Sequence, residues 1–136
     1  MSESNVELVR RLNALFNARD PRWFDLYADD VVFAMPPEWP EEPVYRGHEE
    51  LARLEALWRE NFDDYRWDAV ELIEAGEATV VGLFHHRGRI PNQGTWIEQA
   101  VGTLFTFRDG KVAEVRNWFS WDDALAAGGV ERRPTG

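Results

Sequence analysis

The sequence predicts a single α+β domain in which helices and a curved antiparallel sheet surround an aromatic-lined pocket. Apolar residues recur at helical spacing in the first 62 residues, and the period changes to two between 65 and 120. The 136 residues are enough to close one hydrophobic core. Seven Trp, eight Phe and three Tyr are more rings than such a core needs, which indicates that some serve a pocket or a subunit interface.

The first half of the chain begins with two helices and a strand. A helix is expected over 4–18, because apolar side chains recur there on one face. Asp20-Pro21 begins a second, short helix whose apolar side chains end at Tyr27. A short strand is expected at 31–33, where two β-branched residues precede an aromatic one.

A proline-rich loop separates this strand from a third helix. Four prolines between Met35 and Tyr45 exclude helix and central strand, so we expect a loop with Trp39 at its middle. The third helix follows Arg46-Gly47-His48. Its apolar face is marked by Leu51, Leu54, Trp58 and Phe62.

The second half is expected to be an antiparallel meander followed by a short helix. The four strands are expected near 65–74, 78–90, 95–108 and 111–120. Asp109-Gly110 is the strongest hairpin signal. Ser120 is the expected N-cap of the last helix and Gly128-Gly129 its stop. We expect one domain over 1–136 with an ordered core near 4–130 and a disordered tail at 131–136.

The composition excludes several classes of site and partner. The absence of cysteine rules out disulfides, thiolate nucleophiles and cysteine zinc sites. A net charge of -10 repels phosphate backbones and anionic lipids, so neither nucleic acid nor a membrane is an expected partner. The sequence lacks a membrane-length apolar stretch, and its first residues lack the order of a signal peptide, so we expect a cytoplasmic protein.

No metal or cofactor is expected. The adjacent carboxylates Asp29 and Asp30 could in principle bind a metal, but a role in turn and capping bonds fits them better. His48 follows Gly47 at a helix start, and the neighbouring His85 and His86 point to opposite faces of a strand, so no ligand spacing results.

Alternation along the strands places four polar side chains on one otherwise apolar face. They are His86, Gln99, Thr103 and Asn117. A buried amide or imidazole without a partner costs about 1–3 kcal/mol, so these groups must bond to one another, to water or to a ligand. The alternatives are a strand-end His86 that meets solvent or a neighbour, and a Gln99 that reaches water.

The expected pocket is apolar and ring-lined. Trp39 and Trp58 are placed near its mouth, with His86 and Asn117 as polar anchors. The other expected lining residues are Leu12, Phe16, Tyr27, Met35, Leu54, Phe84, Gln99, Val101, Thr103, Phe105, Val115 and Phe119. The expected ligand is a small apolar or aromatic molecule.

The opposite face of the strands mixes Trp and Leu with charged residues, which is typical of a subunit interface rather than of a solvated face. We therefore expect a homodimer through this outer face. The expected contacts are Leu83, His85, Trp96, Arg116 and Trp118.

The order of elements and several local motifs resemble the nuclear transport factor 2-like superfamily, and within it the bacterial SnoaL-like branch. The motifs lie at 28–33, 45–48, 94–99, 107–112 and 122–128, and the similarity covers about 5–130. The resemblance implies a cone of helices and a strongly bent sheet around a hydrophobic cavity, usually in a dimer. Members serve as isomerases, cyclases, epoxide hydrolases, dehydratases or binding modules, so the fold does not give the function.

The resemblance also excludes one activity and restricts another. Leu12, Met35 and Thr103 stand where ketosteroid isomerase has its tyrosine, its base and its second aspartate, so steroid isomerisation is not expected. Asn117 stands where the polyketide cyclase and epoxide hydrolase branches have an acidic residue. An amide cannot act as a general base, so catalysis would depend on His86, with a reference pKa near 6.5.

Three functions remain open on the sequence. The first is binding of a small apolar or aromatic molecule. The second is a lyase, isomerase or hydrolase of a polyketide- or terpene-like substrate, with His86 as acid-base and Asn117 orienting a carbonyl or water. The third is a structural association module without a ligand.

Overall fold

The computed structural model describes residues 4–131, so the expected disordered tail lies outside the described residues except for Glu131. In chain order the elements are α1 (Asn5–Asn17), η1 (Pro21–Leu26), β1 (Tyr27–Ala34), β2 (Val44–Arg46), α2 (Gly47–Asn61), β3 (Asp64–Gly76), β4 (Thr79–Arg89), β5 (Trp96–Arg108), β6 (Lys111–Trp118) and α3 (Trp121–Ala127). Within 4–131, no helix has the length and apolar composition to cross a bilayer. The cytoplasmic location stays a prediction.

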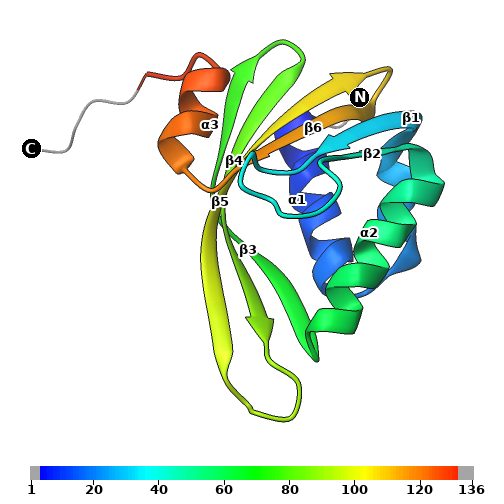
Figure 1. The fold of residues 1–136 in the computed structure, drawn as a ribbon. Coiled ribbons are helices and arrows are strands. Elements are labelled where there is room, and N and C mark those ends of the chain that lie inside the picture. Colours follow the sequence, from blue (N-terminus) through cyan, green and yellow to red (C-terminus); the bar gives the residue numbers. More distant parts are fainter. Residues whose placement is uncertain (1–3, 132–136) are drawn as a thin grey trace, which may run out of the picture.

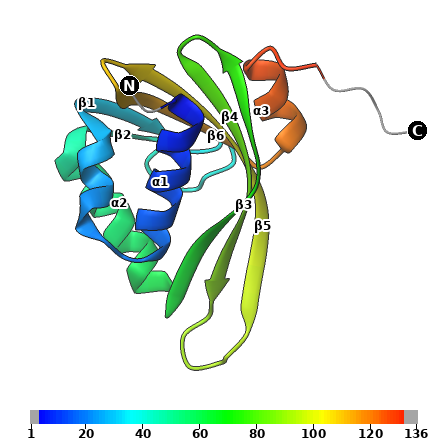
Figure 2. The same cartoon turned by 180° about the vertical axis from the view of Figure 1, so that it is seen from behind.

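The strands form one curved sheet of six in the order β2-β1-β6-β5-β4-β3. β3 to β6 are the expected antiparallel meander. α1 and α2 lie on the concave side of the sheet and α3 lies against the other side (Figures 1 and 2). The α+β class and the bent sheet are confirmed.

The sheet is not wholly antiparallel, because β1 pairs with β6 in parallel. A tight hairpin can only produce antiparallel neighbours, whereas β1 and β6 are separated by most of the chain. This pairing also lengthens the expected strand at 31–33 to Tyr27–Ala34, since Tyr27 lies opposite Val112. Tyr27 therefore begins β1 and does not belong to the short helix.

A three-residue strand interrupts the segment that was expected to be a loop. β2 pairs with β1 so that Tyr45 lies opposite Phe33, at the edge of the sheet. It begins directly after the last of the four prolines, and the carbonyl of Pro43 accepts a hydrogen bond from the Met35 N–H at 2.8 Å. An edge position tolerates neighbouring prolines that a central strand would not.

The predicted turn and cap are confirmed. Asp109 and Gly110 both have positive φ, 54° and 76°, as a two-residue hairpin between β5 and β6 requires. The Ser120 hydroxyl accepts the Asp123 N–H at 3.2 Å at the start of α3. Gly129 ends that helix with a φ of 70°.

α3 covers part of the outer face of the sheet. Val81, Leu83 and Leu104 are buried beneath it with Ala124 and Leu125. The helix approaches closely because the strand below has no side chain at Gly102, where a Cβ would lie 2.4 Å from that of Ala124. Leu83 has no exposed surface, so its expected place in a dimer contact is wrong: its own chain covers it.

Candidate functional site

A cavity of about 650 Å³ lies between the C-terminal end of α2, the loop after β1 and the part of the β4–β5 hairpin that extends beyond the helices. Figure 1 shows this hairpin reaching past α2. The lining residues are Trp39, Glu41, Leu57, Trp58, Asn61, Phe62, Tyr65, His86, Gly88, Ile97, Glu98, Gln99, Val101 and Phe119. The volume is within the range of ligand sites, about 300–1,000 Å³.

One wall of the cavity is built from packed rings. Trp58 of α2 and Tyr65 of β3 are stacked, with centroids 5.4 Å apart and an interplanar angle of 4°. The ring centroid of Phe62 lies 5.2 Å from that of Tyr65. The Phe62 ring packs on Gly88, where a Cβ would come within 2.4 Å of it. Because a side chain at position 88 would collide with Phe62, this glycine fixes how closely the end of α2 approaches β4.

His86 lies at the inner end of this wall. Its ring stacks on Trp67 with centroids 5.1 Å apart and an angle of 17°. The Tyr65 hydroxyl oxygen is 3.1 Å from its Nδ1, and Nε2 has no hydrogen-bond partner within residues 4–131. Burial lowers the pKa of His86 to about 3, so the imidazole is neutral near pH 7.

Beyond His86 the space narrows to two small voids. The first, of about 40 Å³, is bordered by Met35, and the second, of about 10 Å³, by Thr103. His86 and Asn117 border both voids. The alternation prediction is confirmed for the shared face: Gln99 pairs with His86 and Thr103 pairs with Asn117, so all four residues lie on one face of the sheet.

Asn117 satisfies most of its hydrogen bonds within the protein. Its Oδ1 accepts a hydrogen bond from the Thr103 hydroxyl at 2.8 Å, and its Nδ2 donates to the Ala34 carbonyl at 2.9 Å. These bonds join β6 to its neighbours on both sides. A ligand is therefore not needed to account for this buried amide.

The other predicted pocket residues divide into three groups. Trp39, Trp58, Gln99, Val101 and Phe119 line the cavity with His86. Phe84, Phe105 and Val115 border only the 10 Å³ void, while Leu12, Phe16, Tyr27 and Leu54 are in the packed core and border none of these spaces.

The sequence did not predict several lining residues, among them Phe62 and Tyr65, of which Tyr65 contacts His86 directly. Phe62 was placed on the helix without a role in the pocket. The register signal for Tyr65 is simple: Trp67 pairs with His86 across β3 and β4, so the residue two positions before Trp67 faces the same side. The missed lining residues are Glu41, Leu57, Asn61, Phe62, Tyr65, Gly88, Ile97 and Glu98.

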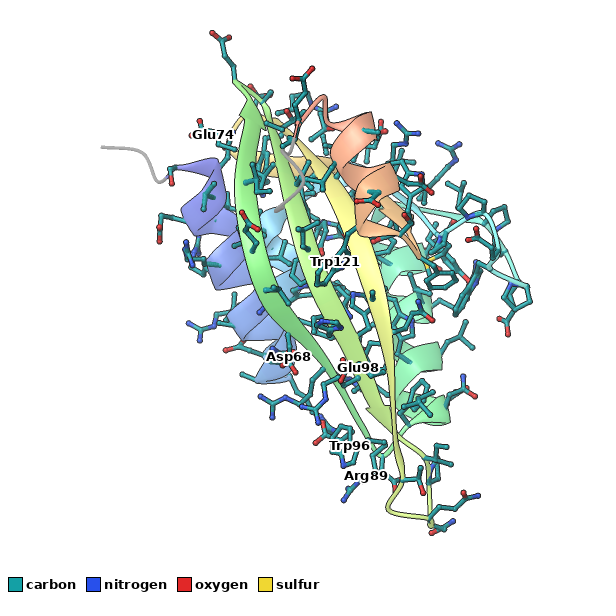
Figure 3. All side chains as sticks on the ribbon, turned by 90° about the vertical axis from the view of Figure 1, so that its left-hand side faces the viewer. Asp68, Glu74, Arg89, Trp96, Glu98 and Trp121 are labelled. Atoms are coloured by element: carbon teal, nitrogen blue, oxygen red, sulfur yellow. The ribbon has the colours of Figure 1, made fainter. Side chains whose placement is uncertain are left out.

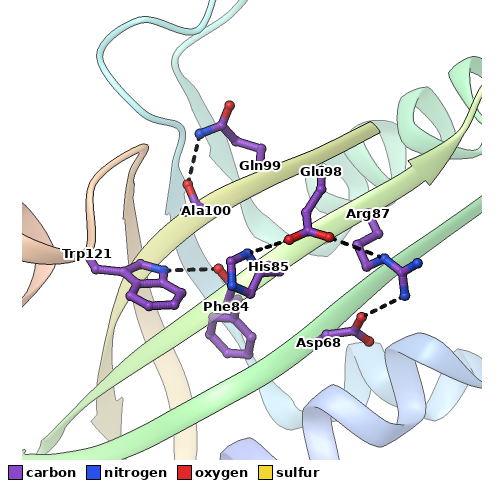
Figure 4. Close-up of polar contacts among 8 residues, drawn as sticks. All are labelled: Asp68, Phe84, His85, Arg87, Glu98, Gln99, Ala100 and Trp121. Atoms are coloured by element: carbon purple, nitrogen blue, oxygen red, sulfur yellow. Dashed lines mark hydrogen bonds and ion pairs between the residues drawn. The ribbon is translucent and has the colours of Figure 1, made fainter. Parts of the chain in front are cut away.

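The outer face carries a chain of polar contacts in place of an apolar patch (Figure 4). Glu98 lies 3.0 Å from Nδ1 of His85 and 3.6 Å from Nε of Arg87. Arg87 reaches Asp68 at 3.3 Å. Figure 3 shows Asp68, Glu98 and Trp96 on the outer side of the sheet, opposite to α1 and α2.

The acidic pair at the start of β1 is exposed. Asp30 forms an ion pair with Arg108, which accounts for one of the two carboxylates. Within residues 4–131, no group of three or more His, Asp and Glu side chains is arranged to hold a metal ion.

The chain resembles several solved structures. Bal32a from a soil-derived mobile gene cassette has a TM-score of 0.76 and 18% identity, covering 88% of this chain and 94% of that one. An NTF2-like protein from Burkholderia pseudomallei has a TM-score of 0.75 and 21% identity, covering 91% and 96%. TerC, co-crystallised with polyporic acid, has a TM-score of 0.74 and 20% identity, covering 92% and 98%. At these identities the likeness establishes the fold alone.

A comparison with curated proteins gives no match. The sequence itself matches the SnoaL-like domain over residues 9–115, which is most of the chain. With the curved sheet and the NTF2-like neighbours, this match shows that the chain belongs to the SnoaL-like domain family of the NTF2-like superfamily.

Proposed function

We propose that the protein binds a small, ring-containing apolar molecule in the cavity that His86 borders. The observation that carries this proposal is a space of about 650 Å³ whose wall of aromatic rings surrounds one neutral imidazole. Apolar walls with a few fixed polar groups are the usual composition of a ligand site. TerC, which has the same fold, was co-crystallised with polyporic acid, and this supports the proposal that a member of the fold binds a small molecule.

Binding is better supported than the catalytic alternative on a polyketide- or terpene-like substrate. That alternative needs His86 as acid-base, and efficient proton transfer near pH 7 needs a pKa close to 7. Burial moves the pKa of His86 to about 3, which makes it a weak base at neutral pH. Asn117, the proposed orienting group, is engaged with Thr103 and Ala34.

Filling the cavity tests the proposal. Gln99 is exposed and lines the cavity, and within residues 4–131 its side chain donates only to the adjacent Ala100 carbonyl. A Gln99→Trp variant therefore adds a ring there without disturbing the core. We expect it to weaken binding of the fluorescent probe N-phenyl-1-naphthylamine by about tenfold or more, a loss of about 1.4 kcal/mol. Probe fluorescence titrations measure the dissociation constants.

Gln93→Trp is the matched control, since Gln93 lies in the β4–β5 turn and does not line the cavity. It should bind the probe like the unmodified protein. Equal affinity of the probe for both variants and the unmodified chain would place binding elsewhere and end the proposal. A probe that fails to bind the unmodified chain, together with no hit in a thermal-shift screen of terpenoids and aromatic ketones, would favour a structural association module.

We also propose that two copies associate through the outer face that α3 leaves uncovered. Trp96 is 39% exposed there, with the Arg87 guanidinium 5.0 Å from its ring centroid, and Arg116 stacks similarly on Trp118 at 4.9 Å. His85, also on this face, contacts Trp121 at 5.0 Å between centroids. Rings combined with arginine are typical of interface centres.

Light scattering at micromolar concentration is expected to give a dimer mass. Trp96→Asp should shift it to the monomer, because a carboxylate replaces the exposed ring at the proposed contact. Lys111→Asp, at the β5–β6 turn, is the control and should remain dimeric. A monomer mass for the unmodified chain would refute the outer-face interface.

A further inference from the structure

Tyr65 contacts the imidazole of His86, one of the polar groups that line the cavity. It is buried on the inner face of β3, and its hydroxyl oxygen lies 3.1 Å from Nδ1 of His86. We propose that Tyr65 is the positioning residue of the site: it keeps the proton of His86 on Nε2, so that the cavity selects a neutral ligand with an acceptor oxygen, such as a ketone. This inference rests on the proposed function.

The direction of the Tyr65–His86 hydrogen bond follows from which atoms of the two groups can donate and which can accept. A neutral imidazole has one nitrogen that donates and one that accepts. Within residues 4–131, Nδ1 of His86 is the acceptor within hydrogen-bond distance of the Tyr65 hydroxyl, since the nearby Trp67 indole N–H can only donate. If Nδ1 carried the proton, the hydroxyl proton would have no acceptor among these residues, so Tyr65 donates to Nδ1 and Nε2 carries the hydrogen.

Ring packing keeps both groups in place. Tyr65 is stacked on Trp58, and His86 is stacked on Trp67, so neither ring can rotate without breaking a stacked contact. Burial favours the neutral form of both groups, since it raises the pKa of Tyr65 and lowers that of His86. The pair is therefore neutral near pH 7, with Nε2–H as its unused donor.

The charges around the cavity disfavour an anionic ligand. Among the described residues its lining contains no Lys or Arg, and Glu41 adds a carboxylate. Glu98 also borders the cavity, but its carboxylate is directed to His85 and Arg87 on the outer face, which leaves the Arg87 guanidinium engaged away from the cavity. A carboxylate in the cavity would be desolvated without a partner, whereas a ketone needs only the single donor of His86.

Three naphthalenes of similar shape test the selectivity. 2-Acetylnaphthalene carries an acceptor oxygen, 2-isopropenylnaphthalene lacks it, and 2-naphthoate carries a charge. By displacement of N-phenyl-1-naphthylamine, the ketone is expected to bind about fivefold tighter than the hydrocarbon, as one net hydrogen bond gives, and 2-naphthoate weaker than either. Equal affinities for ketone and hydrocarbon would overturn the inference but leave the proposed function standing. If none of the three displaces the probe, the proposed function fails as well.

Tyr65→Phe removes the hydroxyl and keeps the stacked ring. We expect the preference for the ketone to fall below about twofold, while the affinity for the hydrocarbon stays unchanged. Nitrogen-15 NMR of the imidazole should show the Nε2–H form alone in the unmodified chain and a mixture of tautomers in the variant. Tyr27→Phe is the matched control, because its hydroxyl is buried away from the cavity. A proton on Nδ1 in the unmodified chain, or an unchanged ketone preference in Tyr65→Phe, would overturn the assignment.

Discussion

Replacing Phe16 with alanine is expected to lower the free energy of unfolding by about 3–5 kcal/mol, as removal of a fully buried aromatic ring does. Phe16 is 2% exposed and stacks on Trp67 with centroids 3.7 Å apart. Trp23, Trp58 and Tyr65 surround it at 5.2, 5.7 and 6.1 Å. The ring joins α1 to α2 and β3, so its loss leaves a cavity that no single neighbour can fill.

Urea unfolding followed by circular dichroism measures this loss. Phe24→Ala is the matched control: the same ring is removed from a half-buried position beside Trp23, at 4.8 Å. Its effect should be about half as large or less, because less apolar surface leaves water there. If the two variants were equally destabilised, Phe16 would not be the centre of the aromatic core.

The Phe16→Ala substitution should also disturb the candidate site. Trp58 and Tyr65, which touch Phe16 on one side, form the stacked wall of the cavity on the other. The ring cluster that stabilises the fold is thus continuous with the surface proposed for the ligand. The aromatic content that first indicated a pocket or an interface therefore has a third use, which is the core itself.

Local sequence signals predicted the elements that depend on local chemistry. The apolar face of α1, the Asp109-Gly110 hairpin and the Ser120 cap each follow from a few neighbouring residues. The parallel β1–β6 pair and β2 could not be predicted in this way, because both depend on strands that are distant in sequence. A three-residue edge strand such as β2 has too few residues to show a period of two.

The sequence predicted which face of the sheet carries the candidate site, but not how deep the cavity is. Strand alternation correctly placed His86, Gln99, Thr103 and Asn117 on one face. Alternation does not say how deeply the helices fill the space in front of that face. Phe16 occupies the inner part of this space, so the open cavity lies nearer the end of α2 and the β4–β5 hairpin. The Thr103–Asn117 hydrogen bond depends on the β5–β6 register and could not be inferred from either residue alone.

Acidification from about pH 6.5 towards pH 4.5 is expected to destabilise the fold through His86. In the folded chain burial lowers its pKa from 6.5 to about 3. Below pH 6.5 the unfolded chain therefore binds a proton at His86 that the folded chain does not bind. The stability contributed by the neutral imidazole is therefore complete above pH 6.5 and is lost as the pH falls towards 3. The limiting slope for one group is about 1.4 kcal/mol per pH unit, and water in the adjoining cavity reduces it, giving a loss of about 1–3 kcal/mol over two units.

The difference between the unmodified chain and His86→Gln isolates this contribution, because other titrating groups appear in both proteins. Asp20, whose pKa Arg22 lowers to about 2, loses its contribution only below its usual value of 3.8 and so lies outside the measured range. Urea unfolding at several pH values should show the stability of His86→Gln falling less steeply than that of the unmodified chain. His85→Gln, which alters the neighbouring imidazole on the outer face, should keep the steep dependence. If the free energy of unfolding had the same pH dependence in the unmodified chain and in His86→Gln, His86 would be able to accept a proton in the folded protein. It would then again be a candidate acid-base group.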